Sequence, residues 1–201
     1  MYFVSLGYDC SPAAALKGLE MRQWSLPLDW VETKGNTLYK VLLDDFAHYH
    51  KNIKLTNNKK RIVDYYGVEF PHDYPTIGGD DTEITEDWEK YSDVVDKKYQ
   101  RRIERFRNIF LESGDKTVMV LFRGALHYAK TLKLILNSRY PNSKIIFIIA
   151  TYEVGDTCIL ENHIIGCNPE RNGGWNEPSI WKEGIDVAFS LETNDISQKC
   201  T

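Results

Sequence analysis

Continuous hydrophobic runs and helically spaced apolar positions divide the chain into a small set of predicted elements. Residues 2–6 form a short apolar run that predicts a strand. Residues 117–122 and 144–150 are apolar on both faces, which is typical of parallel strands covered by helices on both sides. Between them, residues 125–139 carry apolar positions at helical spacing and predict a crossover helix. The three segments together predict a right-handed βαβ unit.

Helical patterns account for most of the remaining chain. Ser11 is suited to cap a helix that has Pro12 at its first position. Residues 37–46 have apolar positions on one face, and residues 88–111 carry a continuous apolar stripe with steps of three or four residues. A final short strand is expected at 186–190.

This pattern favours a three-layer α/β fold with a mostly parallel sheet, of the Rossmann or flavodoxin-like type. A length of 201 residues fits one domain with its own core. We expect that domain to cover residues 1–192, with a long polar insertion at about 51–85. Residues 193–201 are expected to form a flexible tail.

The charge and hydropathy of the chain argue against several classes of partner. The net charge is −4, which gives no electrostatic reason to expect nucleic acid or an anionic membrane as a partner. The longest apolar run, residues 145–150, is far shorter than a membrane span, and no targeting signal is visible. The expected location is therefore the cytoplasm, and the oligomeric state stays open.

Cys10 is the main candidate for chemistry. In open parallel sheets, functional sites lie beyond the carboxyl ends of the strands, where Cys10 and Arg123 are expected. A helix start lowers the pKa of a thiol, and its amides can bind an oxyanion. Gly7 permits the sharp turn that brings Cys10 toward solvent. We expect Gly7, Asp9 and Arg123 to contact the substrate, Arg123 by binding a carboxylate or phosphate.

A nucleophilic cysteine needs a base, and His72 is the best candidate because Pro71 stiffens its approach. Asp73 or Asp29 is placed to orient the imidazole. Each residue also has an ordinary structural interpretation: Cys10 as a small buried hydrophobic residue, His72 as a loop residue and Arg123 as half of an ion pair. The cysteine and histidine spacings predict no metal site, and no cofactor is implied.

Several segments occur in an order that is known from one family. These are residues 3–10 (FVSLGYDC), 24–30 (WSLPLDW), 70–73 (FPHD), 99–106 (YQRRIERF) and 120–123 (VLFR). Together they resemble a family of bacterial and viral proteins of unknown function that are catalogued as candidate papain-like cysteine peptidases. The resemblance covers roughly residues 1–150. It implies Cys10 as nucleophile, His72 as base and Asp29 or Asp73 as orienting acid, and it adds a papain-like α+β fold as the alternative.

The predicted function is therefore a thiol-dependent hydrolase or acyltransferase that acts on a peptide, amide or ester bond of a peptide or small-molecule substrate through a Cys–His pair. Two alternatives stay open. One is a non-catalytic module that binds an anionic ligand, such as a nucleotide or sugar phosphate, through Arg123 and the helix-start amides. The other is an interaction protein that docks partners through its aromatic segments 24–30 and 70–75.

Overall fold

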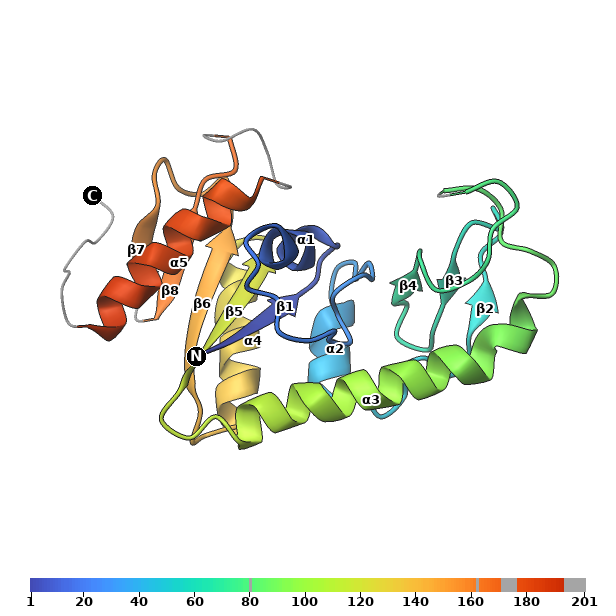
Figure 1. The fold of residues 1–201 in the computed structure, drawn as a ribbon, viewed down its shortest axis with the longest axis horizontal. Helices are drawn as coiled ribbons and strands as arrows, with labels where there is room; N and C mark the ends of the chain where they lie inside the picture. Colours follow the sequence, from blue (N-terminus) through green and yellow to red (C-terminus); the bar gives the residue numbers. More distant parts are fainter. Residues whose placement is uncertain (80, 162, 171–176, 194–201) are drawn as a thin grey trace.

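The computed structural model of the protein describes residues 1–79, 81–161, 163–170 and 177–193. Figure 1 shows how its elements are arranged. In chain order they are β1 (Tyr2–Leu6), α1 (Ser11–Gly18), α2 (Thr37–Leu43), β2 (Lys54–Leu55), β3 (Ile62–Val63), β4 (Glu69–Phe70), the 3-10 turn η1 (Trp88–Tyr91), α3 (Ser92–Leu111), β5 (Thr117–Arg123), α4 (Leu126–Arg139), β6 (Lys144–Ala150), β7 (Cys158–Glu161), β8 (Ile164–Cys167) and α5 (Pro178–Glu192).

A five-stranded sheet forms the centre of the molecule, in the order β1-β5-β6-β8-β7. The first four strands are parallel, and β7 pairs antiparallel with β8 at the edge. Residues of β5 and β6 are almost completely buried, as their continuous apolar runs predicted. The α/β class and the mostly parallel sheet are therefore confirmed.

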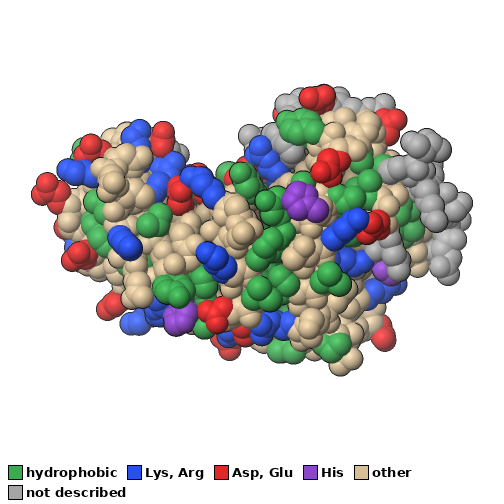
Figure 2. Space-filling view, turned by 180° about the vertical axis from the view of Figure 1, so that it is seen from behind, with side chains coloured by type: hydrophobic (Ala, Val, Ile, Leu, Met, Phe, Trp, Pro, Cys, Tyr) green, Lys and Arg blue, Asp and Glu red, His purple; other side chains and the backbone are tan. Residues whose placement is uncertain are grey.

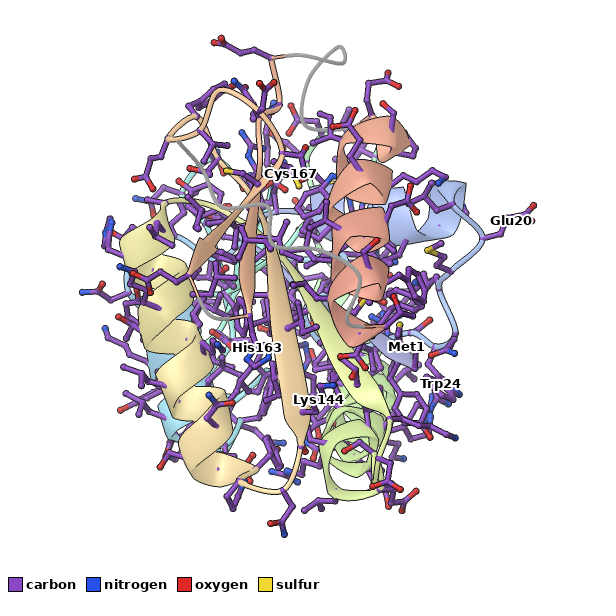
Figure 3. All side chains as sticks on the ribbon, turned by 90° about the vertical axis from the view of Figure 1, so that its left-hand side faces the viewer. Met1, Glu20, Trp24, Lys144, His163 and Cys167 are labelled. Atoms are coloured by element: carbon purple, nitrogen blue, oxygen red, sulfur yellow. The ribbon has the colours of Figure 1, made fainter. Side chains whose placement is uncertain are left out.

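Helices cover both faces of this sheet. In Figure 3, α4 and α5 lie on opposite sides of the strands. One face packs against α1 and α5, through a core that includes Leu16, Met119 and Trp181. The other face packs against α2, α3 and α4 through a larger core that includes Val120, Phe147 and Leu132. Hydrophobic burial on both faces explains why β5 and β6 lack polar alternation.

The polar segment 51–85 contains a second, smaller sheet in the order β2-β3-β4, which is antiparallel. In Figure 1 it lies at one end of α3, whose other end lies below the central sheet. Asp64 organises the loop between β3 and β4, because its carboxylate accepts hydrogen bonds from the backbone N–H groups of His50, Tyr66 and Val68. Burial raises the pKa of Asp64 to about 6.

Three local predictions differ from the structure. Residues 186–190 belong to α5 and not to a strand. The N-cap of α1 is Cys10 and not Ser11. Phe46 lies beyond α2, with a positive φ of 62°, although it is buried in the same core. Except for Thr193, the predicted tail 193–201 lies outside the described residues.

Candidate active site

Cys10 lies where β1 passes into α1, at the carboxyl edge of the parallel sheet. Its thiol is free, and the residue is half-buried. The turn before it needs glycine, since a Cβ on Gly7 would lie 2.6 Å from the carbonyl oxygen of Leu28. The backbone therefore passes too close to its neighbour for any larger residue. This arrangement places the thiol at the sheet edge where the sequence predicted it.

Asp9 links the ends of β1 and β5. One carboxylate oxygen accepts hydrogen bonds from the backbone N–H of Ser11, at 2.9 Å, and from the Ser11 hydroxyl, at 2.6 Å. The other oxygen forms an ion pair with Arg123 at the end of β5. Gly7, Asp9, Cys10 and Arg123 are thus brought together at one edge of the sheet. Because Asp9 occupies the Ser11 amide and Pro12 carries no N–H, this helix start offers fewer amides to an oxyanion than the sequence suggested.

The thiol of Cys10 does not have the lowered pKa that its helix-start position predicted. Burial is the largest influence and raises the pKa, and the carboxylates of Asp9 and Glu32 raise it further. A backbone hydrogen bond at Cys10 and the charge of Arg123 lower it, but their combined effect is smaller. The thiol is therefore protonated at neutral pH. The lowering of the thiol pKa expected at a helix start is outweighed here by burial and by the carboxylates of Asp9 and Glu32.

A short backbone ladder connects the Cys10 turn to the small sheet. The N–H of Thr33 donates to the carbonyl of Tyr8 at 3.0 Å, and the Thr33 hydroxyl donates to the carbonyl of Gly7. Glu32 and Glu69 exchange two backbone hydrogen bonds, of 3.0 and 2.9 Å. Glu69 lies in β4, which ends two residues before the exposed His72. The His72 segment is therefore connected, through β4, to the 32–33 segment that hydrogen-bonds to the turn before Cys10.

Asp29 is almost completely buried and holds the loop after α1 in place. Its carboxylate accepts hydrogen bonds from the hydroxyl of Ser5, from the Nε and Nη2 atoms of Arg22, at 3.2 and 2.6 Å, and from the N–H of Leu26, at 2.9 Å. The guanidinium of Arg22 also lies over the ring of Trp30. One carboxylate oxygen of Asp29 is thus used within this loop, and the other joins the loop to Ser5 of β1.

Asp73 is bound to α3. One of its oxygens forms an ion pair with Lys98, and the other accepts a hydrogen bond of 2.5 Å from the hydroxyl of Tyr99. Nearby, Nε2 of the buried His50 lies 2.7 Å from the hydroxyl of Tyr74. These contacts fix the position of the segment that carries His72 against α3 and the 46–50 turn.

The structure also contains a cavity of about 300 Å³ that the sequence did not reveal. It lies between α2 and α4, next to the carboxyl ends of β1 and β5, and its lining includes Tyr8, Tyr39, Gly124 and Tyr128. Figure 2, seen from behind, shows hydrophobic side chains gathered near the middle of this face of the molecule. No local motif signals such a cavity, because its walls come from segments about a hundred residues apart.

Comparison with known families adds one finding to this geometry. Residues 1–139 match the model of the family described as "Putative papain-like cysteine peptidase (DUF1796)". The chain belongs to this family. The DUF1796 match covers β1, α1 and every element up to the end of α4, so Cys10, His72 and Arg123 all lie inside it. The strands and helix that follow α4 lie outside the matched range.

The family description agrees with the papain-like alternative for the fold, while the central sheet itself is mostly parallel. The comparisons with curated proteins and with solved structures gave no match. In the part of the chain that the structure describes, every helix is too short or too polar to cross a membrane. Within the same residues, His, Cys, Asp and Glu form no group arranged to hold a metal ion.

Proposed function

We propose that the protein is a thiol-dependent hydrolase or acyltransferase in which Cys10 is the nucleophile and His72 the base. The observation that carries this proposal is the position of the free Cys10 thiol at the carboxyl edge of the sheet, two residues after Tyr8, which lines the cavity. Membership of the DUF1796 family supports the general class. The Cys–His pair, the substrate and a cytoplasmic location are parts of the proposal.

The chemistry is acyl transfer in two steps. A base removes the proton from Cys10, and Sγ attacks the carbonyl carbon of an ester or amide, forming a C–S bond. The C–O or C–N bond breaks, the leaving group takes the proton, and a thioester remains. Water, or another acceptor, then attacks the thioester carbonyl and releases the acyl group, and the sulfur recovers a proton.

The raised pKa of Cys10 determines how this reaction is activated. A protonated resting thiol requires the proton to be removed as the substrate reacts, rather than a thiolate–imidazolium pair formed in advance. We assign this step to His72. Its segment follows β4, in which Glu69 exchanges two backbone hydrogen bonds with Glu32. The Glu32 carboxylate is in turn one of the charges that raise the pKa of Cys10. Asp29 or Asp73 would orient the His72 imidazole only by giving up one of its present hydrogen bonds or ion pairs.

Arg123 is proposed to contact the substrate together with Gly7 and Asp9. Its ion pair with Asp9 already balances its charge, so a nucleotide or sugar phosphate would have to compete with the Asp9 carboxylate. For this reason the alternative of an anion-binding module ranks second.

Hydrolysis of p-nitrophenyl esters by four proteins tests the proposal: the wild type, Cys10→Ala, His72→Ala and Cys167→Ala. Cys167 is the matched control, because it is a free thiol buried in the core against α5. We expect Cys10→Ala to abolish turnover and Cys167→Ala to preserve it. His72→Ala should reduce turnover by about 10²–10⁴-fold, with partial rescue by added imidazole. Equal turnover by wild type and Cys10→Ala would overturn the proposal, and an unaffected His72→Ala would assign the base elsewhere.

A further inference from the structure

The cavity between α2 and α4, which Tyr8 of the Cys10 turn helps to line, has a lining suited to one class of chemical group. We propose that it is the acyl-side specificity pocket of the enzyme and that it binds an uncharged aromatic side chain, such as that of phenylalanine. This inference rests on the proposed function, since it places the reacting carbonyl of the same substrate at Cys10.

The position of the cavity connects it to the thiol. Tyr8 lines it and lies two residues before Cys10 in the same turn. Gly124 and Ala125 also line it and directly follow Arg123, whose guanidinium is bound to Asp9. The backbone around Cys10 is thus continuous with two walls of the cavity. The proposal places the side chain of the substrate in the cavity and its reacting carbonyl at the thiol.

The walls favour an aromatic occupant. Four of the ten lining residues are aromatic, namely Tyr8, Tyr39, Phe122 and Tyr128. The rings of Tyr39 and Tyr128 lie 5.6 Å apart between their centroids and are tilted by 38°. Aromatic rings pack with centroids about 4.5–7 Å apart, so a third ring can add to this arrangement.

The charge and depth of the cavity exclude other groups. None of the ten lining residues is an Asp, Glu, Lys or Arg, so a charged group would lose its hydration there without a partner. Among the lining residues, Tyr8 is 47% exposed, whereas Phe122 and Leu132 are buried. The volume of about 300 Å³ lies at the lower limit for ligand pockets. It suits one side chain rather than a complete cofactor.

Ala125 offers a way to fill the cavity without disturbing the fold. It is half-buried and lies at the N-cap of α4 in extended conformation, where a larger side chain meets no helical constraint. Ala125→Leu therefore adds bulk to the lining. Ala47→Leu makes the same chemical change at an exposed residue outside the cavity and serves as the matched control. Circular dichroism and thermal melting of both variants establish that each is folded.

Binding and reactivity are measured separately. Ligand-observed NMR on the full chain with Cys10→Ser gives the Kd of three probes: the amides of N-acetylphenylalanine, N-acetylglycine and Nα-acetyllysine. We expect the phenylalanine amide to bind about tenfold or more tightly than the other two. Adding Ala125→Leu should remove this preference, and adding Ala47→Leu should retain it.

Two results would overturn the pocket assignment. One is equal binding of the phenylalanine and glycine amides, and the other is an unchanged preference in the Ala125→Leu variant. Failure of the proposed function is recognised independently, as ester turnover by the wild type that survives Cys10→Ala. An aromatic preference without Cys10-dependent turnover would show a binding pocket in a protein that lacks the proposed chemistry.

Discussion

Replacing Asp29 tests whether the residue stabilises the fold or serves the reaction. The carboxylate is 2% exposed and accepts hydrogen bonds from Ser5, Leu26 and two nitrogen atoms of Arg22. Asp29→Ala would leave the guanidinium of Arg22, with a side chain 21% exposed, next to an unfilled space. Removing one partner of a buried ion pair costs about 3–5 kcal/mol. For a chain of this size, we expect a decrease in Tm of about 6–20 °C.

Urea denaturation followed by circular dichroism measures the change in the free energy of unfolding. Asp29→Asn, which keeps one oxygen as an acceptor, should lose less stability than Asp29→Ala. Asp115→Ala is the control, because Asp115 is exposed, and it should change stability by less than about 0.5 kcal/mol. A loss below about 1 kcal/mol in Asp29→Ala, as is usual for an exposed ion pair, would refute this reasoning. Loss of ester turnover without loss of stability would instead favour the orienting role.

Three further predictions concern charge and packing. Asp9→Asn should speed alkylation of Cys10 by iodoacetamide at pH 8, because it removes a carboxylate that raises the thiol pKa; an unchanged or slower rate would contradict this cause. Burial lowers the pKa of His50, so the unfolded chain binds a proton that the native protein does not, and stability should fall as pH decreases below about 6.5. His50→Asn should flatten this part of the profile relative to wild type, and parallel profiles would refute the assignment. Gly184→Ala should destabilise by about 1–3 kcal/mol in thermal melts, because its Cβ would lie 2.5 Å from Ile148, and an unchanged Tm would contradict the close packing.

The sequence predicted the central elements well where the hydrophobic pattern is unambiguous. The runs at 117–122 and 144–150 are apolar on both faces and became β5 and β6. The stripe at 88–111 became η1 and α3, because its apolar positions recur at helical spacing and pack against the core along the whole helix. A long, regular pattern of apolar positions is compatible with only one type of secondary structure.

The prediction at 186–190 failed because a glycine hides the helical pattern. Ile180, Trp181, Ile185 and Ala188 form the buried face of α5, but Gly184 interrupts the apolar stripe. A Cβ on Gly184 would lie 2.5 Å from the sulfur of Cys167, so the helix requires glycine to approach the sheet. This reason lies in tertiary packing, which a local pattern does not record.

In the candidate site, too, local sequence predicted some features correctly, while features that depend on tertiary contacts were missed. Glycine and cysteine after a first strand indicated the position of Cys10 correctly, because parallel strands share a carboxyl edge. The sign of the pKa shift was wrong, since it depends on burial and on Glu32, a residue distant in sequence. The partners of Asp73 come from α3, 25 and 26 residues away, and were equally hidden. Long-range contacts determine the chemistry of the site, while local sequence determines its place.

Trapping of an acyl-enzyme tests the central claim most directly. The wild type is mixed with the p-nitrophenyl ester of N-acetylphenylalanine, quenched in acid and analysed by intact mass and by peptide mapping. The account predicts one acyl group on Cys10, which neutral hydroxylamine releases because it is a thioester, and no adduct in Cys10→Ala. An unmodified Cys10 during turnover, or the same adduct in Cys10→Ala, would contradict it.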